Sequence, residues 1–346
     1  MKIADFNIGK DKVFIIAELS ANHGHDIEIA KETIRAAKRA GADAVKLQTY
    51  TPDTITIDCN KDDFIIKGTI WKGKNLFELY KEAYLPWQWH AELFEVARQE
   101  GLICFSSPFD KTAVDFLEEL KVPAYKIASF EITDIPLIEY AASKAKPVII
   151  STGIASEEDI RLAVDACRAM KNNEIILLKT SSQYPAKIED ANLNMIPDLS
   201  KKFNVIAGLS DHTAGDLLPV MATTLGAKII EKHFILDKNI GGPDASFSLD
   251  EKEFKQMVDA VRNAEKALGK VDYSLSEKAL KSREFSRSLY VVKDIKAGEI
   301  ITETYVRSIR PGYGLHPKHL KDILGKKVNR DLEKGTRFEL KFIAKT

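Results

Sequence analysis

Short runs of apolar, often β-branched residues recur along the chain and alternate with longer amphipathic segments. Each run has four to six residues and is almost continuously apolar. This pattern is typical of a strand that is buried on both faces of a parallel sheet. The eight expected strands are Val13–Ala17, Ala42–Leu47, Leu102–Phe105, Ala124–Ala128, Pro147–Ile150, Glu174–Leu178, Asn204–Gly208 and Ala227–Ile230.

Apolar residues recur every three or four positions in the segments between these runs, as in helices with one buried face. Gly41, Gly101 and Gly226 each stand where glycine commonly ends a helix before a strand. Ser156 followed by Asp159 is an N-cap signal. The expected helices are Glu28–Ala40, Trp87–Glu100, Lys111–Leu120, Ile135–Lys144, Glu157–Met170, Gly215–Leu225 and Asp250–Leu268.

Eight strand–helix alternations predict a (β/α)₈ TIM barrel over residues 1–270. The alternative, an open doubly wound sheet, usually carries a glycine-rich phosphate loop, and the chain has neither GxGxxG nor GxxxxGK[ST]. Residues 50–86 form a long insertion after the second strand. The pattern changes after the barrel, which predicts a polar linker at 271–285 and a small module of short strands at 286–346.

Composition narrows the class of protein. The 346 residues contain 51 basic and 51 acidic side chains, which argues against a nucleic-acid partner. No run reaches 18 apolar residues and the first 20 residues lack a signal-peptide pattern, so we expect no membrane span. The three cysteines are odd in number and have no metal-type spacing, so we expect no disulfide framework. These features predict a cytoplasmic enzyme.

Every expected strand ends in polar or ionisable residues, and a barrel gathers its strand ends on one face. Such a convergence favours a catalytic or binding site over a purely structural barrel. In chain order these residues are Glu18, Lys46, Gln48, Ser106, Ser107, Lys126, Ser129, Glu131, Ser151, Thr152, Thr180, Ser181, Ser182, Tyr184, Ser210, Asp211, His212, Glu231, Lys232 and His233.

Two kinds of chemistry stand out among these residues. Lys46 and Lys126 interrupt apolar strands, and together with the hydroxyl groups they predict a phosphate- or carboxylate-binding site. His212 and His233 end adjacent strands, where neutral imidazoles can share a divalent cation. His23 follows the first strand and is either a third contributor or a residue that orders its loop.

The motifs AELSANHG, KLQTYTPD, FSSPFD, YKIASFE, STGIAS, GLSDHT and EKHFILD, in this order, resemble the sialic acid synthase family. The tail from Ser286 to Phe342 resembles the antifreeze-like (SAF) domain that follows the barrel in that family. The insertion segment FIIKGTIWKGKNLFELYKEAYLPWQWH and the tail segment YVRSIRPGYGLHPK are most similar to the pseudaminic acid branch.

The resemblance implies condensation of phosphoenolpyruvate with an N-acylated aldose and water, which gives a nine-carbon 2-keto acid and phosphate by C–O cleavage. In the pseudaminic acid branch the aldose is 2,4-diacetamido-2,4,6-trideoxy-β-L-altrose. The resemblance also implies a divalent cation, Mn²⁺, Mg²⁺ or Co²⁺. It further implies a homodimer in which each SAF domain completes the partner's site.

Carried over onto this sequence, the resemblance implies metal ligands at His212 and His233, and it adds Glu18 and Lys126 as catalytic residues. Neuraminate synthases often have asparagine where this chain has Ser182, which is consistent with a different sugar. The implied phosphoenolpyruvate-binding residues are Lys46, Ser107, Lys126, Ser129, Ser182 and Ser210. The implied sugar-binding residues are Gln48, Glu131, Tyr184, Asp244 and Arg310.

Three alternatives stay open at this point. Within the family, an N-acetylneuraminate or legionaminate synthase is the nearest rival. A Schiff-base aldolase would use Lys126 as its nucleophile and form an imine that borohydride traps. A non-catalytic carbohydrate- or ice-binding protein would act through the tail module, but the polar ends of all eight strands argue against it.

Overall fold

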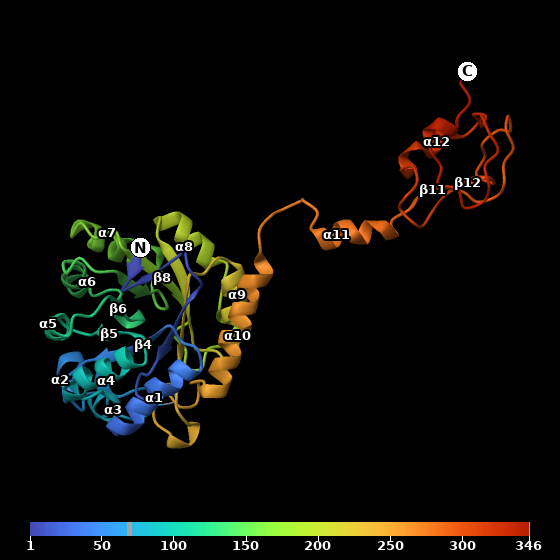
Figure 1. Ribbon diagram of the computed structural model, residues 1–346. Coiled ribbons are helices and arrows are strands. Elements are labelled where there is room, and N and C mark those ends of the chain that lie inside the picture. The colour runs from blue at the N-terminus through green and yellow to red at the C-terminus, as the bar shows by residue number, and fades with distance from the viewer. Residues whose placement is uncertain (68–70, 346) are drawn as a thin grey trace. The chain divides into compact units, whose positions relative to one another are not determined.

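The computed structural model describes residues 1–67 and 71–345, and over these residues eight parallel strands close into a barrel (Figure 1). The predicted (β/α)₈ fold is therefore confirmed. The last strand pairs with the first, in a register that sets His233 opposite Glu18. The barrel strands are β3 (Phe14–Glu18), β4 (Ala44–Thr49), β5 (Ile103–Pro108), β6 (Tyr125–Ile127), β7 (Val148–Ser151), β8 (Ile175–Thr180), β9 (Ile206–Asp211) and β10 (Ile229–His233).

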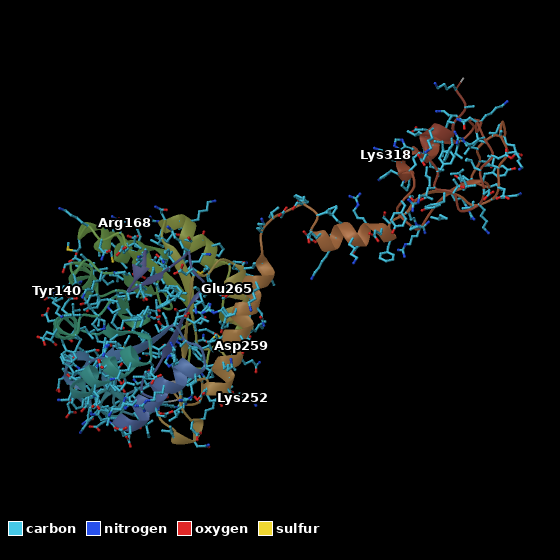
Figure 2. The ribbon with its side chains drawn as sticks, in the orientation of Figure 1. Tyr140, Arg168, Lys252, Asp259, Glu265 and Lys318 are labelled. Atoms are coloured by element: carbon cyan, nitrogen blue, oxygen red, sulfur yellow. The ribbon has the colours of Figure 1, made fainter. Side chains whose placement is uncertain are left out.

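A helix follows each barrel strand and covers the outside of the barrel (Figure 1). Apart from the insertion, these helices are α1 (Ile27–Arg39), α4 (Trp87–Gln99), α5 (Lys111–Glu119), α6 (Ile135–Ala142), α7 (Glu157–Ala169), α8 (Met195–Phe203), α9 (Leu217–Thr224) and α10 (Glu251–Leu268). Seven of these helices were predicted, with ends that agree to within one or two residues, and α8 was not predicted. The N-cap of α7 is confirmed, because Ser156 and Asp159 form a capping box. In α10, charged side chains such as Lys252 and Asp259 are exposed (Figure 2), whereas Phe254 and Val261 are buried.

Side chains alternate between the inside and the outside of the barrel along each strand. Inward residues such as Phe14, Ile149 and Ile176 fill the end of the barrel where the strands begin. A short hairpin, β1 (Lys2–Ile3) and β2 (Phe6–Asn7), contributes Ile3 to the same cluster, and it was not predicted. Because apolar residues occupy this end, the polar inward residues are left at the opposite end, where the strands finish.

The insertion after β4 contains α2 (Pro52–Ile55), a 3₁₀ turn (Asp62–Phe64) and α3 (Leu76–Ala83). Residues 68–70, which belong to the FIIKGTIWKGK part of the quoted motif, lie outside the described residues. A hydrogen bond of 2.7 Å between His25 Nε2 and the Glu82 carbonyl oxygen joins α3 to the loop after β3. The indole N–H of Trp87 donates to the Tyr50 carbonyl oxygen at 3.1 Å. The insertion is thereby attached to the end of the barrel that carries the polar strand ends.

The chain divides into two units, Met1–Gly269 and Lys270–Thr346. The second unit begins with α11 (Glu277–Ser282) and a 3₁₀ turn (Arg283–Phe285). It contains an antiparallel pair of strands, β11 (Ser288–Val291) and β12 (Val306–Ile309), and the short helix α12 (Leu320–Ile323). Residues of these elements contribute to its hydrophobic core. The core residues are Leu289, Val291, Ile295, Ile301, Val306, Ile323, Val328, Leu332, Phe338 and Phe342. Over the described ranges, we find no helix whose length and apolarity would let it traverse a bilayer.

Candidate active site

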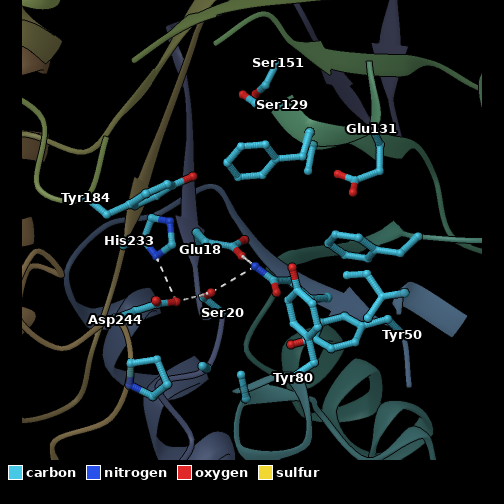
Figure 3. A pocket seen from close by; sticks show the side chains of 18 of the residues that line it. Glu18, Ser20, Tyr50, Tyr80, Ser129, Glu131, Ser151, Tyr184, His233 and Asp244 are labelled. Carbon is cyan, nitrogen blue, oxygen red and sulfur yellow. Dashed lines mark hydrogen bonds and ion pairs between the residues drawn. The ribbon is translucent and has the colours of Figure 1, made fainter. Parts of the chain in front are cut away.

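A cavity of about 400 Å³ lies where the barrel strands end, and it holds most of the polar residues singled out above. Figure 3 shows Tyr184 and His233 on one side of it and Tyr50 and Tyr80 on the other. The apolar part of the wall comes mainly from the insertion and neighbouring loops, with Ile55, Ile66, Leu76, Leu79, Ala83, Phe109, Phe130 and Pro243. The cavity thus combines a charged floor with a largely apolar rim.

Two lysines and two glutamates form the charged floor. Lys46 Nζ lies 2.7 Å from Glu18 Oε2 and 3.6 Å from Glu231 Oε1. Lys126 Nζ lies 3.9 Å from the same oxygen of Glu231. All four side chains are at most 5% exposed. Charges removed from water to this extent are tolerated only when they compensate one another.

Burial and ion pairing shift the pKa values of these buried groups in opposite directions. Burial raises the pKa of Glu18, although Lys46 opposes the shift. Burial would also raise the pKa of Glu231, but Lys126 and Lys46 outweigh it and the net pKa is lowered. Burial lowers the pKa of Lys126 to about 8 and raises the pKa of Glu131 to about 7. A carboxyl group that titrates near neutrality can accept and return a proton during a reaction.

Hydroxyl groups and a glycine surround Lys126. Its Nζ donates to Ser151 Oγ at 2.7 Å, and the backbone N–H of Gly153 donates to Ser129 Oγ at 3.2 Å. A Cβ at Gly153 would lie 2.0 Å from Ser182 Oγ, so the two can approach only because residue 153 has no side chain. Ser182 Oγ is buried and has no hydrogen-bond partner in the described residues. A cationic amine close to several hydroxyl groups suits a phosphate or carboxylate.

His212 and His233 face each other with ring centroids 5.2 Å apart. The Nδ1 of His212 lies 2.9 Å from the Ser181 carbonyl oxygen, which can only accept, so Nδ1 carries the proton and Nε2 keeps a free lone pair. The Nδ1 of His233 is buried without a hydrogen-bond partner, 3.7 Å from Asp244 Oδ2. Burial lowers the pKa of both rings, which keeps them neutral. Neutral imidazoles with free lone pairs fit a divalent cation.

Among the residues that the structure describes, no third His, Cys, Asp or Glu side chain completes a metal site with the histidine pair. In residues 1–67 and 71–345, no group of three or more His, Cys, Asp and Glu side chains is arranged to hold a metal. Any further ligands would therefore come from water or substrate, as in sites that keep coordination positions open for chemistry. His23 does not join the pair, because it does not line the cavity and its Nδ1 accepts from the His25 N–H at 3.1 Å. Of the two roles considered for His23, a third metal ligand or a residue that orders its loop, the structure supports the second.

A polar chain beside Glu18 connects it to Asp244. Gln48 Nε2 donates to Glu18 Oε1 and to Ser20 Oγ, both at 2.9 Å. Ser20 Oγ in turn donates to Asp244 Oδ2, and these contacts are drawn in Figure 3. Burial raises the pKa of Asp244. The chain holds amide, hydroxyl and carboxyl groups along one wall, which is the set of groups that hydrogen-bond to sugar hydroxyls and amides.

The structure brings most of the predicted site residues to this one cavity. Ser107 and Ser182 are predicted site residues that do not line the cavity. Ser107 Oγ accepts from Lys46 Nζ at 3.3 Å, and Ser182 Oγ lies beside Gly153, whose N–H donates to the lining residue Ser129. Arg310 belongs to the second unit, so its role stays a prediction. The predicted residues that line the cavity are Glu18, Lys46, Gln48, Lys126, Ser129, Glu131, Tyr184, Ser210, His212, His233 and Asp244.

Several residues of the cavity received no role from the sequence. Ser151 and Glu231 stood among the polar strand ends, and the alternation of inward positions along β10 pairs Glu231 with His233 on the inner face. That alternation is the signal that identifies Glu231. Ser20, Tyr50 and Tyr80 follow no comparable pattern, because they belong to loops and to the insertion.

Comparison with known proteins identifies the family. Residues 33–273 match the NeuB family, and residues 286–338 match the SAF domain. A pseudaminic acid synthase from Campylobacter jejuni subsp. jejuni serotype O:23/36 (strain 81-176) is 55% identical over 335 residues, 97% of each chain. Another from Helicobacter pylori (strain ATCC 700392 / 26695) is 52% identical and covers 93% of this chain and 95% of its own.

A solved structure agrees with these matches. It is that of N-acetylneuraminic acid (sialic acid) synthetase from Leptospira borgpetersenii serovar Hardjo-bovis, with a TM-score of 0.72 and 32% identity. The match covers 82% of this chain and 94% of that one. The resemblance to the sialic acid synthases is therefore confirmed for the barrel and for the tail, and the chain belongs to the NeuB family, with a C-terminal SAF domain.

Proposed function

We propose that the chain condenses phosphoenolpyruvate with 2,4-diacetamido-2,4,6-trideoxy-β-L-altrose and water to form pseudaminic acid and phosphate. The observation that carries this proposal is one cavity in which a lysine- and hydroxyl-lined anion site adjoins the neutral pair His212 and His233. The 55% and 52% identities to pseudaminic acid synthases support the choice within the family. The Schiff-base and ice-binding alternatives have no comparable support.

The anion site would bind phosphoenolpyruvate. Lys46 and Lys126 provide two positive charges at the floor of the cavity, which offset the phosphate and carboxylate charges of the substrate. The unsatisfied Ser182 hydroxyl can donate to the bound anion. The hydroxyls assigned to this binding are those of Ser107, Ser129, Ser182 and Ser210.

In the reaction, the C2=C3 π electrons of phosphoenolpyruvate form the bond from C3 to the aldehyde carbon, and positive charge develops at C2. The C=O π bond of the aldehyde breaks, and its oxygen takes up a proton and becomes a hydroxyl group. Water then adds to C2 with loss of a proton, and the C2–O bond to phosphate breaks as the new C2 hydroxyl loses its proton and becomes the 2-keto oxygen. Glu18 would stabilise the charge at C2 and take a proton from the incoming water. Its raised pKa suits that transfer, because the carboxyl group can hold the proton afterwards. Gln48 orients Glu18 through the 2.9 Å hydrogen bond.

His212 and His233 would hold a divalent cation such as Mn²⁺, Mg²⁺ or Co²⁺. When bound there, the ion would supply a positive charge that polarises the aldehyde carbonyl. The fit rests on the free Nε2 of His212 and on the buried, unsatisfied Nδ1 of His233. The hydrogen bond from His212 to Ser181 orients the first ring.

The apolar rim favours a deoxy, acylated sugar. Residues such as Ile55, Ile66 and Leu79 offer contacts to methyl groups and no hydrogen bonds from their side chains. The proposed aldose carries three methyl groups, one at C6 and one on each acetamido group. Its polar groups would bind on the opposite wall, where the residues assigned to the sugar are Gln48, Glu131, Tyr184 and Asp244.

The same proposal includes the arrangement of the domains and their assembly. The synthase barrel would comprise residues 1–270, the linker 271–285 and the SAF domain 286–346, in a cytoplasmic homodimer. Arg310 would complete the partner's sugar site, because its planar guanidinium suits an acyl or carboxylate oxygen. The second unit has a core of its own, with ten buried apolar residues among those described, so it can fold as a module.

Phosphate release tests the proposed reaction. The enzyme is incubated with phosphoenolpyruvate, a divalent cation and the proposed aldose in ¹⁸O-water. The masses of the sugar acid and of the phosphate are then measured by mass spectrometry. We expect phosphate release that depends on the aldose, with ¹⁸O in the sugar acid and none in the phosphate. Label in the phosphate would show P–O cleavage and contradict the assigned role of Glu18. Release without the aldose would contradict the condensation.

A further inference from the structure

Lys232 and Asp211 form a buried ion pair on the outer side of the barrel wall, facing away from the cavity. They lie opposite each other on β10 and β9, and their side chains are 0% and 1% exposed. Lys232 Nζ donates to Asp211 Oδ2 and, at 2.6 Å, to the Thr213 carbonyl oxygen. Neither side chain lines the cavity, so neither can touch the substrates directly.

The pair joins the two backbone segments that carry the histidines. Asp211 Oδ1 accepts hydrogen bonds from the Thr213 N–H at 2.9 Å and from Thr213 Oγ1 at 2.8 Å, which closes a tight turn with His212 at its centre. Lys232, the residue directly before His233, reaches across to the same turn. Each histidine is therefore adjacent in sequence to one member of the pair. The contact thus links the turn that carries His212 to the strand that carries His233, in addition to the backbone pairing of β9 and β10.

Stability alone does not account for a lysine and an aspartate at these positions. The neighbouring outward residues of the same strands, Ile230 and Leu209, are apolar and pack in the main core. Replacing a buried ion pair by apolar residues of similar volume is often neutral or stabilising, because the two charges no longer have to be desolvated. An ion pair does, however, fix geometry more tightly than apolar packing does, since its hydrogen bonds are directional.

We propose that Lys232 and Asp211 are positioning residues that set the spacing and orientation of His212 and His233 for the divalent cation. This inference rests on the metal-binding pair of the proposed function. Residues that hydrogen-bond to metal ligands typically change metal affinity 10- to 100-fold when they are removed, because they orient the ligands. We expect an effect of that size here.

Two charge-free double variants test the inference. In D211N/K232M, the asparagine Oδ1 can still accept from Thr213, so the turn keeps its own hydrogen bonds and only the contacts of Lys232 with Asp211 and with the Thr213 carbonyl oxygen are lost. In D211L/K232L, both charged side chains are replaced by apolar ones. Binding is then measured on each double variant that unfolds cooperatively. The matched control is Lys179→Met, since Lys179 is also a buried outward lysine, on the next strand β8, and donates only to the Thr180 carbonyl oxygen among the described residues at 2.9 Å.

The readouts are the Kd for Mn²⁺, from electron paramagnetic resonance of free Mn²⁺, and the Kd for phosphoenolpyruvate without metal. We expect Mn²⁺ binding about 10- to 100-fold weaker in the double variants, with phosphoenolpyruvate binding and K179M unchanged. Wild-type Mn²⁺ affinity in a folded double variant would overturn this inference but leave the proposed metal-binding pair intact. Equal losses for both ligands would mean general loosening and would also overturn it. Absence of Mn²⁺ binding to the wild type would overturn the proposed metal pair itself.

Discussion

Glu18 Oε2 lies 2.7 Å from Lys46 Nζ, and the register of β3 and β4 places the two residues directly side by side. This pair joins the two proposed roles of the cavity, because Lys46 is proposed to bind the anion and Glu18 is proposed to act at the reacting carbon. A phosphate or carboxylate that binds Lys46 competes with Glu18 for the same ammonium group. Substrate binding would therefore release the Glu18 carboxylate for use at C2.

Glu18→Gln separates these two roles. The amide has nearly the same shape but cannot take a proton from water, so we expect kcat to fall by about 10²- to 10⁴-fold. It also removes the carboxylate that competes for Lys46, so the Kd for phosphoenolpyruvate should stay the same or decrease. Steady-state kinetics and calorimetry measure the two quantities. A large rise in Kd with unchanged kcat would show that Glu18 acts in binding and not in the chemical step.

Chelation tests the histidine pair. Exhaustive treatment with EDTA should abolish turnover, and Mn²⁺ should restore it, because the two neutral rings would hold the cation that polarises the aldehyde. His212→Ala and His233→Ala should each lower kcat by orders of magnitude even with Mn²⁺ added. Thermal unfolding of the variants serves as the control for folding. Full activity after chelation would refute the metal requirement.

The pH dependence should follow Lys126. Burial lowers its pKa to about 8, so below that pH the side chain is protonated and can bind the anion, and above it the charge is lost. We therefore expect kcat/KM for phosphoenolpyruvate to decline as the pH rises through about 8, since this ratio reports the free enzyme. Lys126→Arg keeps its charge to much higher pH and should remove the decline. A decline that is the same in both enzymes would assign it to another group.

The sequence predicted the barrel because each buried strand is a continuous apolar run, but it placed several strand ends too early. The predicted eighth strand stops at Ile230, whereas β10 continues to His233. The predicted second strand stops at Leu47, whereas β4 continues to Thr49. The reason is physical. The last inward positions of these strands line a polar cavity, so the apolar run stops before the backbone pairing does.

Other features depend on contacts between distant parts of the chain. The hairpin of β1 and β2 has two-residue strands, too short for a periodic signal. Helix α8 follows a polar stretch and has only a short apolar stripe, with Ile196, Leu199 and Phe203 buried. The ion pair of Lys232 with Asp211 becomes visible only once the register of β9 and β10 is known. Local sequence patterns carry none of this information.

Mixing two inactive variants tests whether Arg310 acts across a dimer. Arg310→Ala and His212→Ala chains are each expected to be nearly inactive alone. If Arg310 serves the partner's barrel, each heterodimer has one site with both residues intact, so a statistical mixture should recover about one quarter of wild-type activity. Mass spectrometry of the intact assembly verifies that heterodimers form. Heterodimers without activity would place Arg310 in its own barrel's site, and an Arg310→Ala chain that is fully active alone would leave Arg310 without a role.

A competition experiment tests the proposed specificity most directly. The enzyme receives limiting phosphoenolpyruvate and equal concentrations of 2,4-diacetamido-2,4,6-trideoxy-β-L-altrose, the corresponding legionaminate precursor and N-acetylmannosamine, and the nonulosonic acids formed are identified by nuclear magnetic resonance. We expect pseudaminic acid as the main product, because relatives that are 55% and 52% identical are pseudaminic acid synthases and the apolar rim suits a methyl group at C6. A predominance of legionaminic or N-acetylneuraminic acid would contradict the proposed function.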